Sequence, residues 1–230
     1  MSGIFLSLEG IDGSGKTTQA ARLVEILRGA GHRVISVREP GSTALAERVR
    51  QVLLDPAASA ISPRAELLLY VACRAQLVDE VIRPALDAGA VVVSDRFADS
   101  TLAYQGYGRE LGPEVVREAN MVATGGLAPA LTFVLDIPPE EAVRRRGASA
   151  ADRLEGEARA FHERVRRGFL EIAHREPERV SVVDGGLPPE EVASRILDLI
   201  DSRFPELLAD RPRSIHGRNA DQLSMRTDNG

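Results

Sequence analysis

Short apolar runs alternate along the chain with longer segments that repeat apolar positions every three or four residues. Five of the runs are short enough to be strands, and they cover residues 4–8, 33–37, 90–94, 131–135 and 180–184. The last three are apolar at most positions, which is typical of strands buried on both faces. The pattern predicts an α/β fold in which helices cover both faces of a five-stranded parallel sheet.

Helical periodicity marks the segments between these strands. One helix begins at Ser62-Pro63, where a capping hydroxyl precedes a proline in the first turn, and Pro84 predicts a kink before this helix ends near Gly89. The other amphipathic segments cover residues 15–28, 45–53, 161–172 and 194–204.

Polar or glycine-rich residues collect where each predicted strand stops. They are Glu9-Gly10, Arg38-Glu39, Asp95-Arg96, Asp136 and Asp184-Gly185. The carboxyl ends of parallel strands open on one side of the sheet, and ligands bind in the crevice outside them. The sequence therefore predicts that these clusters surround one site.

The first cluster opens a phosphate-binding loop. Residues 10–18 read Gly-Ile-Asp-Gly-Ser-Gly-Lys-Thr-Thr between a predicted strand and a predicted helix, which fits the phosphate-loop pattern. Its glycines allow backbone N–H groups to surround a polyphosphate at the positive end of the helix. We expect Lys16 to reach the outer phosphates and the Thr17 hydroxyl to ligate Mg²⁺. The nucleotide-binding residues predicted here are Gly10, Asp12, Gly13, Ser14, Gly15, Lys16, Thr17 and Thr18.

Composition narrows the class of protein. The 230 residues suit one domain with a small lid, and a net charge of −5 argues against a surface for nucleic acid. Cys73 is the only cysteine, and the chain has neither a leader-like start nor an apolar run near 18 residues, so we expect a cytoplasmic protein without a membrane partner. Lys16 is the only lysine among 29 basic side chains. Because a compact ammonium and a broad guanidinium are not interchangeable, this site is interpreted as one that needs lysine.

Two segments depart from the α/β pattern. Residues 144–153 read Arg-Arg-Arg-Gly-Ala-Ser-Ala-Ala-Asp-Arg, and a small, basic stretch of this kind predicts a lid at about 144–155 that closes over phosphates and excludes water. Beyond Phe204 the chain is polar and lacks periodicity, which predicts a disordered tail at 205–230. A single domain at 1–204 is therefore expected.

A phosphate loop alone is compatible with regulatory GTPases, motor ATPases and small kinases. A guanine-reading Asn-Lys-x-Asp element is absent, because Lys16 is the only lysine, and the lid favours a kinase. Arg153 and the run Arg144–Arg146 are candidates to stabilise a transferred phosphoryl group. A solvated basic helix face is the alternative, and for each arginine of the run taken singly both remain open.

Other residues gain meaning from their positions. Asp95 could hold Mg²⁺ through water and Arg96 could clamp an acceptor phosphate, although a strand-end salt bridge is the simpler alternative. Asp12 is an anion inside an anion site, which suggests that it faces a hydroxyl or the metal shell. Tyr70 and Arg74 lie one helical turn apart and could stack on a base and bond its edge. On these two residues alone, however, side chains that complete a core face are the favoured alternative.

Taken together, these stretches resemble the thymidylate kinase family, whose members phosphorylate dTMP with ATP. The resemblance extends from Gly3 to about Phe204 and is carried by residues 9–18, 38–41, 70–74, 95–97, 100–106 and 152–155. It implies a P-loop NTPase-type fold, ATP as donor, Mg²⁺ and a homodimer. The neutral Gly13-Ser14 loop with arginines in the lid is similar to the bacterial type, while the spacer 147–151 departs from the family pattern.

The resemblance also implies roles for individual residues. Asp12 would contact the acceptor sugar near the metal, Arg38 and Arg96 would hold the dTMP phosphate, and Tyr70 would stack on thymine. The implied substrate-binding set is completed by Arg74, Ser100, Tyr104 and Gln105, the catalytic set is Asp12, Lys16, Arg96, Arg146 and Arg153, and the metal set is Thr17 and Asp95.

The expected mechanism is direct in-line transfer of the γ-phosphoryl group to dTMP, in which positioning and charge stabilisation supply the catalysis. Two alternatives remain open from the sequence: a kinase for another nucleoside monophosphate, and a nucleotide-gated regulatory module without enzymatic activity.

Overall fold

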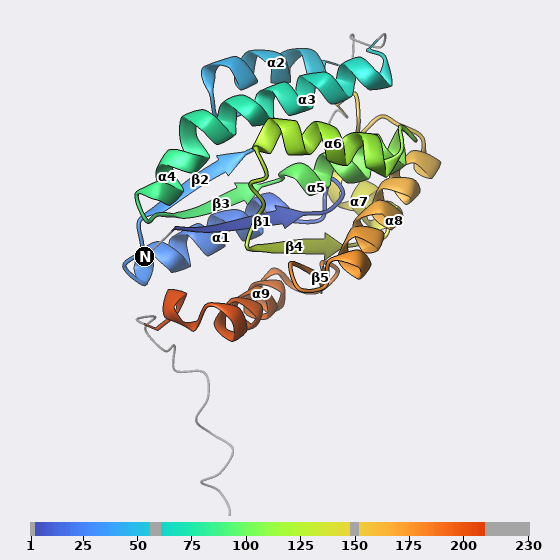
Figure 1. Ribbon diagram of the computed structural model, residues 1–230. Coiled ribbons are helices and arrows are strands. Elements are labelled where there is room, and N and C mark those ends of the chain that lie inside the picture. The colour runs from blue at the N-terminus through green and yellow to red at the C-terminus, as the bar shows by residue number, and fades with distance from the viewer. Residues whose placement is uncertain (1–2, 56–60, 148–151, 210–230) are drawn as a thin grey trace, which may run out of the picture.

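A parallel five-stranded sheet forms the centre of the protein (Figure 1). The computed structural model describes residues 3–55, 61–147 and 152–209. Within them the strands lie in the order β2-β3-β1-β4-β5, and each neighbouring pair is parallel. The bounds are β1 Ile4–Glu9, β2 Val34–Arg38, β3 Val91–Asp95, β4 Leu131–Asp136 and β5 Val180–Asp184. The predicted sheet is confirmed.

Helices connect the strands and cover both faces of the sheet. They are α1 Lys16–Gly29, α2 Ala44–Leu54, α3 Pro63–Leu77, α4 Arg83–Asp87, α5 Ala98–Thr101, α6 Pro113–Thr124, α7 Pro139–Arg146, α8 Arg159–Arg175 and α9 Pro189–Arg203. Wider π-helical turns, η1 Val78–Ile82 and η2 Leu102–Gly108, follow α3 and α5, and a 3₁₀ turn, η3 Pro205–Leu207, follows α9.

The side chains of each strand alternate between two packed layers. In β1, Leu6 and Leu8 lie in the core shared with α1 and α9, whereas Phe5 lies in the core formed with η1 and α4. A third cluster, which includes Phe161, Val165 and other residues of α8, packs with η2 over the β4 and β5 side. Burial on both faces accounts for the near-continuous apolar runs of the central strands.

The start of α3 is as predicted, but its continuation differs. The Ser62 hydroxyl accepts a hydrogen bond from the Ala65 N–H (3.4 Å), with Pro63 in the first turn. The predicted simple kink at Pro84 is not what the structure shows. The turn before this proline widens into η1, and the Arg83 N–H donates to the Val78 carbonyl five residues back.

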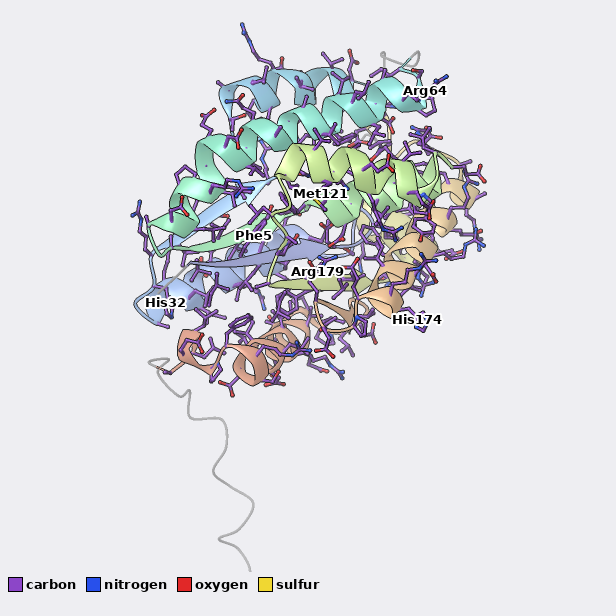
Figure 2. All side chains as sticks on the ribbon, in the orientation of Figure 1. Phe5, His32, Arg64, Met121, His174 and Arg179 are labelled. Atoms are coloured by element: carbon purple, nitrogen blue, oxygen red, sulfur yellow. The ribbon has the colours of Figure 1, made fainter. Side chains whose placement is uncertain are left out.

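Three sequence expectations need correction. The sequence pattern predicts no helix between residues 98 and 124, yet the chain forms α5, η2 and α6 there. The last helix begins at Pro189 rather than 194. The boundary at Phe204 is too early, because Leu207 is 2% exposed in the core and its carbonyl lies 3.0 Å from His32 Nε2. His32 lies in the turn between α1 and β2 and is labelled in Figure 2. The rest of the predicted tail, from 210 on, lies outside the described residues.

The order of the strands places a crevice beside β1. The chain leaving β1 crosses through α1 towards β2, whereas the chain leaving β3 crosses to β4 on the other side of β1. The loops after β1 and β3 therefore diverge, and a ligand crevice is expected between them. Within the described segments, no helix is both long and apolar enough to cross a bilayer.

Candidate active site

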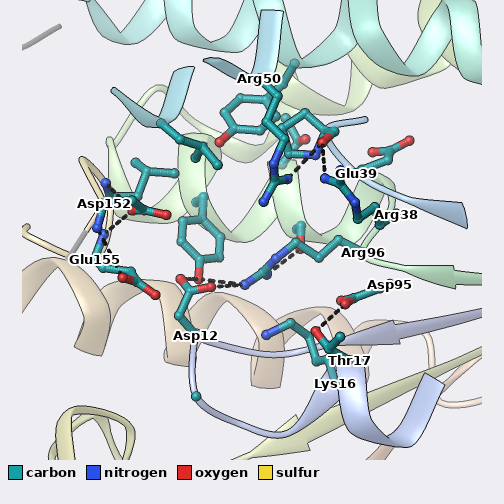
Figure 3. Close-up of a pocket in the computed structure, with 18 of the residues that line it drawn as sticks. Asp12, Lys16, Thr17, Arg38, Glu39, Arg50, Asp95, Arg96, Asp152 and Glu155 are labelled. Carbon is teal, nitrogen blue, oxygen red and sulfur yellow. Dashed lines mark hydrogen bonds and ion pairs between the residues drawn. The ribbon is translucent and has the colours of Figure 1, made fainter. Parts of the chain in front are cut away.

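A cavity of about 610 Å³ opens at the carboxyl ends of β1, β2 and β3 (Figure 3). Its walls come from the phosphate loop, the β2 and β3 ends, α3, η2 and the lid segment. The structure brings most of the predicted residues together there: Asp12, Gly13, Gly15, Lys16, Thr17, Arg38, Tyr70, Arg74, Asp95, Arg96, Ser100, Tyr104 and Gln105. Arg50 and Arg145 also line it, and neither was singled out individually from the sequence as a site residue.

The phosphate loop has the backbone that an anion cradle requires. Gly10 has a φ of +134°, and a Cβ built there would lie 2.5 Å from the Leu135 carbonyl oxygen, so a larger residue is excluded. The Lys16 ammonium is buried and donates to the Ile11 carbonyl (2.8 Å). Burial, together with the charge of Arg96, lowers the pKa of Lys16 to about 8. The first turn of α1 carries no acidic residue, so an incoming polyphosphate meets a positive helix end.

Thr17 and Asp95 form a pair suited to Mg²⁺. The Thr17 hydroxyl donates to Asp95 Oδ2 at 2.6 Å, which joins the loop after β1 to the end of β3. Among the residues that the structure describes, no three His, Cys, Asp or Glu side chains gather into a metal cage. One hydroxyl and one carboxylate are the donor set expected for Mg²⁺, which takes its other ligands from phosphates and water.

Asp12 faces Arg96 across the loop (Figure 3). Arg96 Nη2 lies 2.5 Å from Asp12 Oδ1, and the Tyr104 hydroxyl donates to Asp12 Oδ2 at 2.7 Å. Burial alone would raise the pKa of Asp12, but the charges of Arg96 and Lys16 hold it well below its usual range. Asp12 is therefore ionised, and its oxygens can only accept hydrogen bonds.

The backbone of Arg96 is fixed in an uncommon conformation. Its φ is +74°, which non-glycine residues seldom adopt. The Arg96 N–H donates to the Leu8 carbonyl (3.0 Å), and the Ser94 hydroxyl donates to the Arg96 carbonyl (2.5 Å). Such backbone outliers cluster at functional sites, where the surroundings hold them.

Buried Glu9 supports this turn from beneath. Its Oε1 accepts the Phe97 N–H at 2.7 Å and its Oε2 accepts the Ser100 hydroxyl at 2.5 Å. Burial raises the pKa of Glu9 to about 7, and the nearby charge of Asp99 adds to the rise. Sequence reasoning noted Glu9 only as a strand-end residue. The sequence could have indicated its burial, because Glu9 directly follows the apolar run 4–8, and a carboxylate at the end of a central strand is expected to be buried.

Arg74 is held in a buried network of protein contacts. Its guanidinium is 1% exposed and forms an ion pair with Glu39, and it donates to Asn120 Oδ1 (2.6 Å) and Thr101 Oγ1 (2.9 Å). It also donates to the Phe97 carbonyl (3.0 Å). The side chain therefore cross-links four segments. Contact with a base edge stays a prediction, although Arg74 does reach the cavity wall.

Other predicted acceptor-side residues surround the open part of the cavity. Arg38 projects from the end of β2 and donates from Nη2 to both Glu47 oxygens (2.9 Å). Arg50 donates to the Pro40 carbonyl at 2.8 Å, which adds a second cation to this wall. Burial raises the pKa of Tyr70, so this phenol stays neutral beside the cavity. Asp136, by contrast, is outside the cavity lining and forms a two-pronged ion pair with Arg166 (2.7 and 2.8 Å).

The lid arginines are placed differently from expectation. Arg144 and Arg145 belong to the last turn of α7, pair with Glu141, and only Arg145 of these two lines the cavity. Arg153 was expected at the phosphates, but it is turned away: Nε donates to the Leu53 carbonyl (2.8 Å) at the end of α2. The side chain of Arg146 and the spacer 148–151 lie outside the described residues.

The cavity combines a glycine-rich anion loop, a Thr–Asp pair suited to Mg²⁺ and, beneath the lid, a second wall with arginine and tyrosine side chains. This combination defines a P-loop kinase for small phosphorylated acceptors. The comparisons make this class specific. The family model described as thymidylate kinase matches residues 8–196, and the chain belongs to the thymidylate kinase family.

Relatives and a solved structure agree with this assignment. Thymidylate kinases of Desulfosudis oleivorans and Synechococcus sp. (strain JA-2-3B'a(2-13)) are 49% and 52% identical to the chain, over 89% and 90% of its length and 99% of theirs. The crystal structure of thymidylate kinase from Ehrlichia chaffeensis is 33% identical, with a TM-score of 0.71 over 87% of this chain and 99% of that one.

Proposed function

We propose that this protein transfers the γ-phosphoryl group of ATP to dTMP in the presence of Mg²⁺, forming dTDP and ADP. The observation that carries the proposal is a single cavity in which the phosphate loop faces the Arg38, Tyr70 and Arg96 wall. A donor triphosphate and an acceptor monophosphate can therefore meet without a covalent enzyme intermediate. The thymidylate kinases to which the chain is similar identify the acceptor as dTMP.

On the donor side, the loop 10–18 would surround the triphosphate. Lys16, which now donates to the Ile11 carbonyl, would turn to the outer phosphates. Thr17 and Asp95 would hold Mg²⁺, directly or through water. The metal, when bound, neutralises charge that builds on the phosphate oxygens.

On the acceptor side, Arg38 and Arg96 would hold the dTMP phosphate, and ionised Asp12 would accept a hydrogen bond from the sugar hydroxyl. Tyr70 would stack on thymine, whereas Arg74, Ser100, Tyr104 and Gln105 would shape the base pocket. In-line transfer then needs only alignment and charge stabilisation, to which Lys16, Arg96 and the lid arginines contribute. Arg145 is the described lid arginine best placed for this. Arg146 stays a candidate, whereas Arg153 would have to leave Glu66 and the Leu53 carbonyl to reach the phosphates.

A panel of nucleoside monophosphates tests the substrate. With ATP and Mg²⁺, we expect dTMP to give the highest kcat/KM by ADP formation. Equal or faster turnover of CMP or AMP would assign the chain to another acceptor. Nucleotide binding measured as a thermal shift without any ADP formation would favour the regulatory module.

A homodimer is also proposed, on the apolar face shared by α3 and α6. Leu68 on α3 and Met121 and Val122 on α6 are 63%, 62% and 86% exposed, and the two helices pack against each other. Figure 2 labels Met121 on this side of the molecule. Light scattering should give twice the 24.8 kDa chain mass. Val122→Glu should give the monomer, and a monomeric unsubstituted protein would refute the proposal. A cytoplasmic location fits the buried, unbridged Cys73.

A further inference from the structure

Glu66 is a buried carboxylate that lies outside the cavity wall and has partners from two segments, Gln105 and Arg109 at the end of η2 and Arg153 in the lid. It belongs to the first turn of α3 and is 0% exposed. Gln105 Nε2 donates to Oε1 (2.7 Å), Arg109 donates to both oxygens (3.2 and 3.1 Å), and Arg153 Nη2 lies 2.6 Å from Oε2. A buried carboxylate with this many partners fixes the relative positions of the segments that supply them.

One connection from Glu66 leads into the lid. Arg153 is 8% exposed and reaches the end of α2 as well, where Nε donates to the Leu53 carbonyl (2.8 Å) and its backbone N–H donates to the Leu54 carbonyl (3.4 Å). These are carbonyls at a helix C-terminus, where a cation is favoured. Arg153 therefore joins the lid to both α2 and α3.

A second connection reaches the lid a few residues further on. Arg109 Nη1 lies 2.5 Å from Glu157 Oε1, and its guanidinium lies 4.8 Å from the centre of the Phe161 ring at the start of α8. Both ends of the stretch 152–157 are thus connected to Glu66, directly at Arg153 and through Arg109 at Glu157. Two carboxylates balance two guanidinium groups, so the cluster carries no net charge.

The third connection leads to the cavity. Gln105 is 1% exposed but lines the cavity. Its amide nitrogen Nε2 donates a hydrogen bond to Glu66, which fixes the orientation of the side-chain amide. The neighbouring lid residues Asp152, Leu154 and Glu155 line the same cavity. The acceptor wall and the lid wall are therefore oriented by one carboxylate.

We propose that Glu66 is a positioning residue for phosphoryl transfer, which sets the lid stretch 152–157 and the Gln105 amide in the correct places around the bound substrates. The proposal rests on the proposed function. Glu66 does not line the cavity, so it would act through Gln105, Arg109 and Arg153. Without its charge, Arg109 and Arg153 lose their shared partner, the lid stretch loosens, and water reaches the donor phosphate.

Glu66→Gln tests the proposal, because it keeps the shape and removes the charge. Asp99→Asn is the matched control: Asp99 is also a buried carboxylate paired with an arginine, Arg179 (2.7 and 2.8 Å), but it does not line the cavity or pair with any described residue of the lid. Each variant is assayed for dTDP and ADP separately, and for trypsin cleavage after Arg153 relative to cleavage after exposed Arg144.

Glu66→Gln should lower kcat about 100-fold, which is the effect expected when the reacting groups are misplaced by roughly 1 Å. It should also raise the ratio of ADP to dTDP above one, because water then competes with dTMP for the phosphoryl group. Cleavage after Arg153 should accelerate. Asp99→Asn should keep the ratio at one and the cleavage pattern unchanged. Identical ratios and cleavage patterns in the two variants would overturn the proposal.

Glu157→Gln covers the case in which Glu66→Gln does not fold, since Glu157 is 29% exposed. It removes only the outer connection and should shift both readouts in the same direction by a smaller amount; no shift in either would count against the proposal. If the unsubstituted enzyme forms no dTDP, the proposed function fails, whereas the trypsin readout still decides whether Glu66 holds the lid.

Discussion

Replacing Glu9 by glutamine should change how stability depends on pH. Glu9 is 0% exposed beneath the Arg96 turn, and burial raises its pKa from 4.5 to about 7. The folded protein thus binds the Glu9 proton more tightly than the unfolded chain does. The stability that comes from protonated Glu9 is complete below about pH 4.5 and is lost as the pH rises through 7. Glutamine cannot lose a proton, so the variant lacks this dependence.

The size of the effect follows from the shift. A difference of 2.5 pKa units between folded and unfolded states corresponds to roughly 3 kcal/mol, at about 1.4 kcal/mol per unit. The unfolding free energy of Glu9→Gln, relative to the unsubstituted protein, should therefore rise by roughly this amount between pH 4.5 and about pH 8. The lowered pKa of Lys16 comes mainly from burial and from the charge of Arg96, which both proteins share, so most of it cancels in the difference.

Urea unfolding of both proteins at a series of pH values measures this difference. Glu190→Gln is a suitable control, because hydrogen bonding from Arg22 lowers the pKa of exposed Glu190. The unfolding free energy of this variant, relative to the unsubstituted protein, should therefore fall rather than rise as the pH increases. Parallel stability curves for Glu9→Gln and the unsubstituted protein would refute the reasoning, since Glu9 would then ionise as it does in water.

Three further substitutions test the cavity. Lys16→Met removes a buried ammonium from the phosphate cradle and should lower kcat by about 10³-fold while circular dichroism stays unchanged; full activity would remove the loop from the mechanism. Thr17→Ala removes the hydroxyl that faces Asp95 and should raise the Mg²⁺ concentration for half-maximal rate about 10-fold, so an unchanged Mg²⁺ titration would exclude Thr17 as a ligand. Arg74→Met leaves Glu39 buried without its charge partner and should cost about 3–5 kcal/mol in urea unfolding; a loss below about 1 kcal/mol would contradict the cross-linking role.

The sheet could be predicted because its signals are local. Each strand is an apolar run that ends in polar residues, and burial on both faces leaves little ambiguity. The helix α6 was missed although Gly112-Pro113 and Gly125-Gly126 bracket it as start and stop signals. The π-helical turn η2 has no comparable signal, because its hydrogen-bond pattern depends on the packing of α8 against it.

The site was predictable where a motif carries the chemistry within a few residues, as in the loop 10–18. It was not predictable where function depends on contacts across the fold. Glu66 is an ordinary first-turn glutamate in the sequence, and only the folded chain brings Arg109 and Arg153 to it. The same reason explains why the contacts of Arg153 could not be predicted: its charge and lid position were apparent, but the direction of its side chain depends on the carbonyl end of α2.

The single lysine gives the protein a built-in spectroscopic probe. Protein grown with ¹³C- and ¹⁵N-labelled lysine contains one labelled side chain, which lies in the phosphate cradle, so its NMR signal needs no assignment. Because the pKa of Lys16 is lowered to about 8, the Cε chemical shift should titrate near neutral pH in the free enzyme. A bound polyphosphate favours the ammonium form and should move this titration upwards. One resonance therefore reports both the charge of the cradle and its occupancy.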